Sequence, residues 1–216
     1  MREKVAPLLS TKSDHQVKDL PGLQSDTLVH WSGHIPIDAA RDANIFYWLF
    51  ESTSKDKDDA PLIVWLNGGP GCSSLIGQFL EVGPLGLSSD SRVEINKNSW
   101  SKVGHLLFID QPVGTGYSFS NGGNSNCRND EACNQDFYRF MINFLKVHTQ
   151  FLKKDSNGLM STRRIILTGE SHAGHVIPSF TKFVLEKNSQ AKQRKKFGSV
   201  ILNIDAVTIG NGWIDP

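Results

Sequence analysis

The sequence has few cysteines and no excess of charge of one sign. Three cysteines, Cys72, Cys127 and Cys133, are an odd number, so at least one has no disulfide partner inside the chain. The 23 Lys and Arg residues balance the 22 Asp and Glu residues to a net charge of +1. Domains that bind nucleic acid usually carry a strongly basic face. We therefore expect no nucleic-acid partner.

Long apolar runs are also missing. The most apolar stretches, residues 61–66 and 105–109, have the length of strands and fall far short of the roughly 18 consecutive apolar residues of a membrane-spanning helix. Residues 1–19 include basic residues but lack the apolar stretch of about 7–15 residues that a signal peptide needs. We expect neither a membrane span nor a signal peptide in this sequence, and its composition does not indicate an oligomeric state.

The two later cysteines leave two alternatives. Cys127 and Cys133 are six positions apart and could close a small disulfide loop in an oxidising compartment. They could equally be free thiols. The sequence alone does not decide between these states.

What the chain does contain is typical of a folded globular domain. Of its 216 residues, 38% are hydrophobic and 21% are charged, which is close to average usage. Residues 1–25 are polar and aperiodic, so we expect a flexible or extended lead-in there. Residues 26–216 are then one domain, or a large part of one.

The apolar pattern predicts an α/β fold. Residues 27–33 and 44–50 alternate like an antiparallel strand pair, with a turn around residues 35–42. Short apolar runs predict four buried parallel strands, and helical spacing predicts two helices. The predicted strands are 61–66, 105–110, 164–168 and 200–209, and the predicted helices are 134–153 and about 173–188. Alternating strands and helices favour a largely parallel sheet with helices on both faces.

A glycine-flanked serine carries the first chemical motif. Residues 169–174 read GESHAG, directly after an apolar strand and directly before a helix. A nucleophile elbow needs this arrangement, because the chain reverses within a few residues and strains the backbone of the serine. Gly169 and Gly174 would supply the room. The alternative is that Ser171 merely caps the following helix.

A glycine-rich loop forms the second motif. Residues 66–74 read LNGGPGCSS after another buried strand, and such a loop can point backbone N–H groups at a ligand. In the hydrolase scheme, one oxyanion donor follows the nucleophile, here His172, and the other comes from this kind of loop, for which Gly69 is the candidate. The loop could instead be a simple tight turn. It lacks the spacing of phosphate and dinucleotide sites. We expect neither a cofactor nor a metal in this chain.

Four segments together resemble the serine carboxypeptidases of the carboxypeptidase Y type. They are residues 65–74 (WLNGGPGCSS), 110–118 (DQPVGTGYS), 169–175 (GESHAGH) and 210–216 (GNGWIDP). The resemblance spans about residue 20 to the last residue. It implies an α/β-hydrolase fold and the removal of single residues from peptide or protein C-termini, in acidic vacuoles or lysosomes or outside the cell.

The resemblance assigns roles to individual residues. It makes Ser171 the nucleophile, with the backbone N–H groups of Gly69 and His172 as the oxyanion hole. It also implies that Asn67, beside Gly68, binds the terminal carboxylate of the substrate.

Two acidic residues complete this implied substrate site. The resemblance adds Glu81 and Glu170 to the group that binds the terminal carboxylate. A carboxylic acid can donate a hydrogen bond to a carboxylate only while it keeps its proton, and two close carboxyl groups raise one another's apparent pKa. Binding should therefore favour acidic pH.

The chain also departs from the family pattern. His172 stands where tyrosine is usual, and Ile76 stands where an aromatic side chain often lines the pocket for the departing residue, so the preferred C-terminal residue stays open. Cys72 corresponds to a family cysteine that normally forms a disulfide with one further along the chain, for which this sequence offers no matching partner.

The largest departure concerns the general base. In this fold, the triad follows the order Ser, Asp, His, and the only histidines after Ser171 are His172 and His175, both beside it. Neither can turn back to face the serine hydroxyl. We expect the N-terminal part of a serine carboxypeptidase, inactive alone because the triad Asp and His are missing. The alternatives are a non-catalytic binding chain, or pseudoenzyme, and a related acyltransferase.

Overall fold

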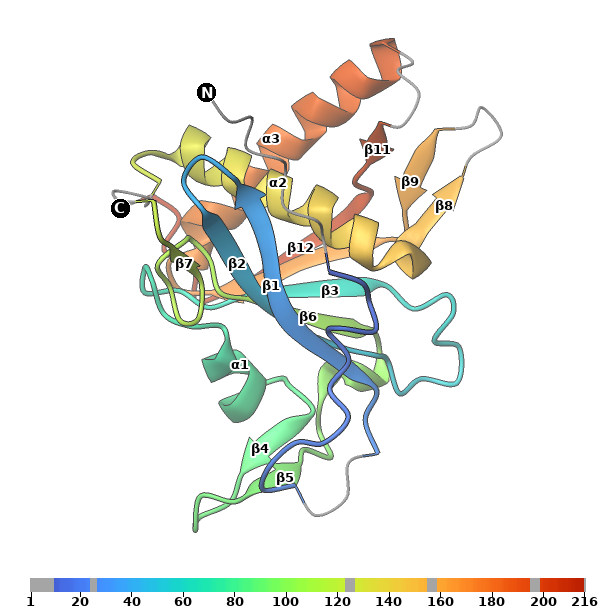
Figure 1. The fold of residues 1–216 in the computed structure, drawn as a ribbon, viewed down its shortest axis with the longest axis vertical. Coiled ribbons are helices and arrows are strands. Elements are labelled where there is room, and N and C mark those ends of the chain that lie inside the picture. Colours follow the sequence, from blue (N-terminus) through green and yellow to red (C-terminus); the bar gives the residue numbers. More distant parts are fainter. Residues whose placement is uncertain (1–9, 24–26, 123–126, 155–158, 195–198, 216) are drawn as a thin grey trace.

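The computed structural model describes residues 10–23, 27–122, 127–154, 159–194 and 199–215. A seven-stranded mixed sheet runs through its centre (Figure 1). Six strands lie in the order β1 (His30–Asp38), β2 (Ala43–Phe50), β6 (His105–Ile109), β3 (Leu62–Leu66), β10 (Ile165–Glu170) and β12 (Ile204–Gly210), and β7 (Phe119–Ser120) pairs with β2.

Parallel pairing in this sheet follows the predicted pattern. The strands β6, β3, β10 and β12 are mutually parallel, whereas β1, β2 and β6 pair antiparallel. Adjacent parallel strands that are not adjacent in sequence require crossover connections, and the intervening helices supply them. The expected α/β class is confirmed, with an antiparallel strand pair extending the parallel strands on one side.

Helices cover both faces of the sheet. The helices α2 (Asp130–Val147) and α3 (Ala173–Arg194) lie on one face, and the short α1 (Leu75–Leu80) lies on the other (Figure 1). The larger core cluster is built around Phe137, Phe140 and Phe144 of α2, which recur every three or four residues and are almost fully buried. No helix in the described part of the chain is long and apolar enough to span a bilayer.

Smaller elements surround this sheet. A hairpin of β4 (Leu85–Leu87) and β5 (Val93–Ile95) follows α1, and β8 (Leu152–Lys154), β9 (Met160–Thr162) and β11 (Val200–Ile201) form a three-stranded sheet. Two single 3-10 turns, η1 (Trp100–Lys102) and η2 (Thr149–Phe151), lie in the connections.

The single buried strand predicted for residues 200–209 is wrong. The run divides into β11 and β12, which belong to different sheets. The strand pairing is interrupted at Leu202, whose backbone bonds the side chain of Asn188 on α3. The N–H of Leu202 donates to Asn188 Oδ1 at 3.1 Å, and Asn188 Nδ2 donates to the carbonyl of Leu202 at 2.8 Å. The strand β12 is at the edge of the central sheet and most of its residues are exposed, including Val207. The apolar run at residues 200–209 therefore does not form a strand that is buried on both faces of the sheet.

Element ends also differ from the sequence-based boundaries. The strand β1 continues to Asp38, so the turn that joins it to β2 begins later than residue 35. The helix predicted for 134–153 begins at Asp130, where Asn129 caps it by accepting from the N–H of Ala132, and ends at Val147. The last helix extends beyond residue 188 to Arg194.

Residues 10–23 contain no helix or strand, yet they lie against β1. The N–H of Ser32 donates to the carbonyl of His15, and the N–H of Val17 donates to the carbonyl of His30. The His15 side chain is buried between Ser10 and Tyr47, with which its ring nitrogens form hydrogen bonds. The remaining residues of the expected lead-in, 1–9 and 24–25, lie outside the described residues.

Candidate active site

Ser171 lies on a sharp turn between β10 and α3. Its φ of 54° lies in the left-handed region, which is uncommon for a residue other than glycine. The strain is held by backbone hydrogen bonds: its N–H donates to Gly210, and its carbonyl accepts from Gly174 and Trp213. The serine is exposed, and its hydroxyl has no hydrogen-bond partner among the described residues. This is the geometry of a nucleophile elbow.

Glycines let three backbone segments meet at this turn. A side chain at Gly169 would place its Cβ 2.3 Å from the carbonyl oxygen of Leu66 and 2.7 Å from the Cβ of Ala173. A Cβ at Gly68 would lie 2.8 Å from both the backbone nitrogen of His172 and the Cβ of Ser171. The glycine-rich loop therefore touches the elbow, although the two are about a hundred residues apart in sequence.

Two backbone N–H groups beside Ser171 are unoccupied. Within the described parts of the chain, neither the N–H of Gly69 nor that of His172 donates a hydrogen bond. Gly69 has a φ of 118°, a conformation that side-chain-bearing residues rarely adopt. Two free donors on segments that meet at the serine are what an oxyanion hole requires.

Asn67 joins the loop to two carboxyl groups. Its Nδ2 donates to Oε1 of Glu81 at 3.2 Å and to Oε1 of Glu170 at 2.9 Å. Its Oδ1 accepts from the indole Nε1 of Trp65 at 2.8 Å and from the N–H of Gly77 at 2.9 Å. All the hydrogen-bonding capacity of this buried carboxamide is used, so its orientation is fixed. The structure thus brings together the three side chains implied to bind a carboxylate.

Glu81 is the carboxyl group whose protonation the site perturbs. Burial raises the pKa of Glu81 above its ordinary value, the hydrogen bond from Asn67 opposes that rise, and the nearby charge of Glu170 adds to it. Its backbone N–H donates to Gly77 at the end of α1. A raised pKa favours the protonated acid, which is the form that can donate to a second carboxylate.

A residue that sequence reasoning did not single out fixes the glycine-rich loop. Asp110 is 1% exposed, and its Oδ1 accepts from Ser73 Oγ at 2.7 Å and from the N–H of Ser74 at 2.9 Å. Its Oδ2 accepts from the N–H of Tyr117 at 2.9 Å. Burial raises the pKa of Asp110, and these three donors oppose the rise. Asp110 follows a strand that is predicted to be buried, and this position was the sequence signal that could have singled it out.

No imidazole in the described chain faces the serine hydroxyl. The ring of His175 points away from it, to Asp130 of α2, with Nε2 3.1 and 3.2 Å from the two carboxylate oxygens. Burial, together with the charge of His175, lowers the pKa of His172. The two rings are tilted with centroids 5.5 Å apart. Neither histidine is placed to act as a general base for Ser171.

The structure settles the state of the cysteines. Cys127 and Cys133 form a disulfide beside the N-terminus of α2, and Cys72 is a free, exposed thiol in the glycine-rich loop. Of the two alternatives left by the sequence, the disulfide loop is the one observed. In the described residues, no group of three or more His, Cys, Asp or Glu side chains is arranged to hold a metal ion.

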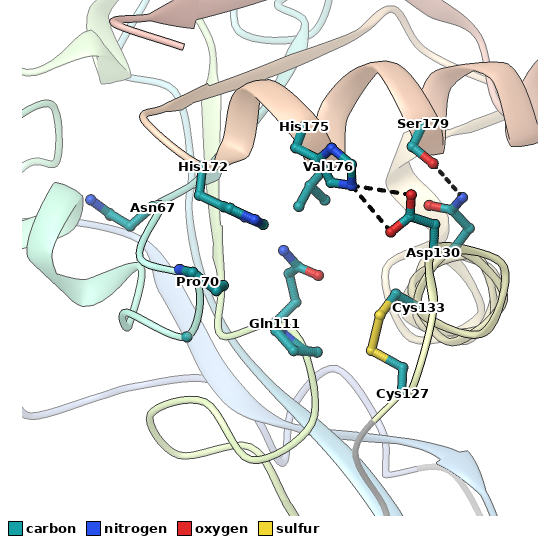
Figure 2. A pocket seen from close by; sticks show the side chains of 14 residues that line it. Asn67, Pro70, Gln111, Cys127, Asp130, Cys133, His172, His175, Val176 and Ser179 are labelled. Atoms are coloured by element: carbon teal, nitrogen blue, oxygen red, sulfur yellow. Dashed lines mark hydrogen bonds and ion pairs between the residues drawn. A yellow bond between two sulfur atoms is a disulfide. The ribbon is translucent and has the colours of Figure 1, made fainter. Parts of the chain in front are cut away.

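A pocket of about 210 Å³ opens beside the elbow, between the glycine-rich loop, the loop after β6 and the first turns of α2 and α3. Figure 2 shows side chains from these segments around it, with His172 and Gln111 between Asn67 and Asp130. His172, the residue that follows Ser171, lines the pocket. A ligand that reaches Ser171 can therefore extend into it.

Comparisons with known proteins identify the family to which this fold belongs. The family model described as serine carboxypeptidase matches residues 21–216. The pheromone-processing carboxypeptidase KEX1 of Phytophthora infestans is 38% identical over 215 residues, which are 99% of this chain and 35% of that protein. Serine carboxypeptidase 3 of Hordeum vulgare is 37% identical over 199 residues, covering 91% of this chain and 36% of that protein.

A solved structure extends the similarity to three dimensions. The crystal structure of the prohormone-processing carboxypeptidase Kex1Δp of Saccharomyces cerevisiae matches with a TM-score of 0.79 and 34% identity, covering 96% of this chain and 45% of that one. The chain spans about a third of the length of the curated relatives it matches. Its fold is that of an α/β hydrolase. On the family match and this structural similarity, the chain belongs to the serine carboxypeptidase family.

Proposed function

We propose that this chain carries the nucleophile and the terminal-carboxylate site of a serine carboxypeptidase, which removes single residues from the C-termini of peptides. The observation that carries the proposal is the position of Asn67. It bonds both Glu81 and Glu170, and Glu170 directly precedes Ser171. A peptide whose terminal carboxylate binds this group has its last peptide bond within reach of the serine.

The chemistry would begin with attack by Ser171 Oγ on the carbonyl carbon of that bond. The negative charge that develops on the carbonyl oxygen would be stabilised by the N–H groups of Gly69 and His172. Collapse of the tetrahedral intermediate breaks the C–N bond, releases the terminal residue and leaves an acyl-enzyme on Ser171, which water then hydrolyses. A base must accept the hydroxyl proton in the first step, and it would come from the part of a full-length relative that this chain does not match.

Recognition of the terminal carboxylate would depend on protons held in the site. Two ionised glutamates would repel a third carboxylate, whereas a protonated Glu81 can donate to it. The raised pKa of Glu81 supports this form at mildly acidic pH. Substrates with a C-terminal amide lack the negative charge and have an NH2 group in place of one carboxylate oxygen, so they should bind poorly.

Two observations support an oxidising and acidic working environment, such as a vacuole, a lysosome or the cell exterior. The disulfide between Cys127 and Cys133 persists in oxidising compartments. The carboxyl groups of Glu81 and Glu170 both bond Asn67, and the raised pKa of Glu81 favours its protonated form at acidic pH. We propose this location for the whole protein.

A non-catalytic binding role is the second candidate, favoured because no imidazole in the described residues forms a hydrogen bond with the hydroxyl of Ser171. The peptidase role and the binding role can be separated by expressing the complete coding sequence. The protein and its Ser171→Ala variant are then assayed with blocked dipeptides. The peptidase proposal predicts release of the C-terminal residue that this variant abolishes, and only trace activity from the 216-residue chain alone. Binding of C-terminal acids by the complete protein without any Ser171-dependent release would establish the second role.

A further inference from the structure

The side chain of Gln111 is nearly buried and has no hydrogen-bond partner among the described residues. It follows Asp110 at the end of β6 and is 8% exposed, yet its carboxamide forms no hydrogen bond with any described residue. Figure 2 shows this carboxamide directed into the pocket beside the elbow, between His172 and Asp130. Its amide atoms are not sealed off from the pocket, in contrast to those of Gln78. Both the donor and the acceptor of this carboxamide are therefore available to a molecule that enters the pocket.

Other groups in the pocket define the chemistry that it accepts. Asn134 donates from Nδ2 to Ser179 Oγ at 2.8 Å, and no described residue donates to its Oδ1. His175 and Asp130 already pair with one another across the pocket wall. The remaining walls are apolar or covalently closed: Pro70, Pro112, Val176 and the disulfide of Cys127 and Cys133. The pocket thus offers both donors and acceptors but no unpaired formal charge.

Charged ligands match this lining poorly. A carboxylate that enters meets the carboxylate of Asp130, and that carboxylate already pairs with His175, so it is not free to hold a cation. A neutral amide has one donor side and one acceptor side, as Gln111 does, and two amides can exchange a pair of hydrogen bonds. Amide groups are therefore the ligand class that uses what the pocket offers.

The position of the pocket relates it to the reaction. The proposed carboxylate site is at Glu81 and Glu170, so the rest of a bound peptide must leave Ser171 in another direction. In Figure 2, His172 and Gln111 lie between Asn67 and Asp130, along the pocket that extends to the first turn of α2. His172, whose N–H is one of the two proposed oxyanion donors, lines this path.

We propose that Gln111 binds an amide group of the peptide on the acyl side of the scissile bond, and that this pocket selects substrates by that contact. The proposal rests on the proposed function, because it assumes that the peptide terminus occupies the site at Asn67. The amide can belong to the peptide backbone or to an Asn or Gln side chain at the penultimate position. Gln111 is a binding residue in this account and takes no part in proton transfer.

Calorimetry on the 216-residue chain with the free acid of acetyl-Ala-Gln-Leu tests the proposal. The Gln111→Met variant keeps the length of the side chain and removes its amide. We expect it to lower affinity for this peptide about tenfold, the loss expected for a pair of neutral hydrogen bonds. The matched control is Gln193→Met, which makes the same change on an exposed part of α3 and should bind like the parent chain.

Two altered peptides identify the source of the amide. If the side chain is bound, replacing the penultimate Gln by Met weakens binding to the parent chain as much as Gln111→Met does. If the backbone is bound, replacing the Ala–Gln amide by an ester has that effect. Either result supports the proposal. Equal affinity of Gln111→Met and the parent chain for the original peptide overturns it.

A second measurement covers the case in which Gln111→Met does not fold. The side-chain amide resonances of Gln111 in the parent chain should shift when the peptide is added. If they stay in place while those of Asn67 shift, the pocket is not used and the proposal is wrong. The C-terminal amide of the same peptide separates this outcome from failure of the proposed function. If acid and amide bind equally, the carboxylate site is refuted, whereas the response of Gln111 still reports on the pocket.

Discussion

The carboxamide of Asn67 donates a hydrogen bond of 2.9 Å to the carboxylate of Glu170, which lies 103 residues further along the chain and directly precedes Ser171. This contact ties the glycine-rich loop to the nucleophile elbow through side chains, in addition to the close backbone approach at Gly68. The proposed binding group and the proposed nucleophile are therefore fixed relative to one another before a substrate arrives, and fixed geometry of this kind is what catalysis by positioning requires.

Replacing Asn67 by Leu should destabilise the fold as well as the site. The indole N–H of Trp65 and the backbone N–H of Gly77 would lose their acceptor inside the protein, and unpaired buried donors cost about 1–3 kcal/mol each. We expect the free energy of unfolding to fall by about 2–4 kcal/mol in urea denaturation. Asn98→Leu, at an exposed position, is the control and should change it by less than about 0.5 kcal/mol. Equal stability of both variants would show that the Asn67 bonds contribute little.

Glu81 should make carboxylate binding depend on pH. Its pKa is raised by burial, so the folded chain holds this proton at a pH where the unfolded chain has lost it. Affinity for a peptide acid should therefore rise as pH falls toward that pKa from above. Glu81→Gln keeps a neutral donor at every pH and should flatten the profile above pH 4.5, the ordinary pKa of a glutamate. A titration by nuclear magnetic resonance checks this, and an unchanged profile in the variant would assign the pH dependence elsewhere.

The sequence predicts the parts of the site that depend on local chain geometry. An apolar run, a glycine-flanked serine and a helical pattern follow one another, so Ser171 could be expected at the junction that β10 and α3 form. The positive φ of Ser171 and the close contacts of Gly169 agree with that expectation. The catalytic and binding roles themselves stay predictions until they are measured.

Features that depend on distant partners could not be predicted in this way. The break between β11 and β12 depends on Asn188, a residue of the preceding helix, and nothing in an apolar run indicates such a partner. The vacant carboxamide of Gln111 becomes visible only when every neighbour is placed. The motif around Asp110 carries part of the family resemblance, but the hydrogen bonds from Ser73 and Ser74 to Asp110 are visible only in the three-dimensional structure.

Buried histidines should make the chain less stable in acid. Tyr47 Oη lies 2.6 Å from Nδ1 of His15 and 2.7 Å from Nε2 of His148, and one hydroxyl can donate to only one of them. Both rings can bond it when neutral, one as donor and one as acceptor. Burial, with smaller contributions from the charges of Lys12 and His15, lowers the pKa of His148 to about 3.

The sign of the pH effect follows from that shift. Between its ordinary pKa and about 3, the unfolded chain binds a proton at His148 that the folded chain does not, so stability falls as pH falls through this window. The loss between pH 6.5 and 5 should be roughly 2 kcal/mol, at about 1.4 kcal/mol per pH unit. His148→Gln cannot titrate and should reduce the slope of unfolding free energy against pH. A slope that the variant leaves unchanged would contradict this account.

Gln78 offers a test of buried polarity away from the site. It lies in α1 and is fully buried, and neither side-chain atom, Nε2 nor Oε1, has a hydrogen-bond partner in the described chain. Replacement by Met keeps the shape of the side chain and removes the desolvated amide. We therefore expect the free energy of unfolding to stay the same or to rise by up to about 1–3 kcal/mol, with a matching rise in the unfolding temperature. Gln193→Met at the exposed position is the control. If Gln78→Met lowers the free energy of unfolding by more than about 1 kcal/mol while the control does not, the amide of Gln78 has a hydrogen-bond partner in solution.

Binding of a peptide acid and its C-terminal amide to the 216-residue chain at pH 5.5 tests the central claim most directly. The side-chain resonances of Asn67 report on the carboxylate site in the parent chain, and Asn67→Leu serves as the comparison for affinity. The account predicts that the acid binds at least tenfold more tightly than the amide, that it shifts the Asn67 resonances, and that Asn67→Leu removes the difference. Equal binding of acid and amide to the parent chain, or a preference for the acid that survives in Asn67→Leu, would contradict it.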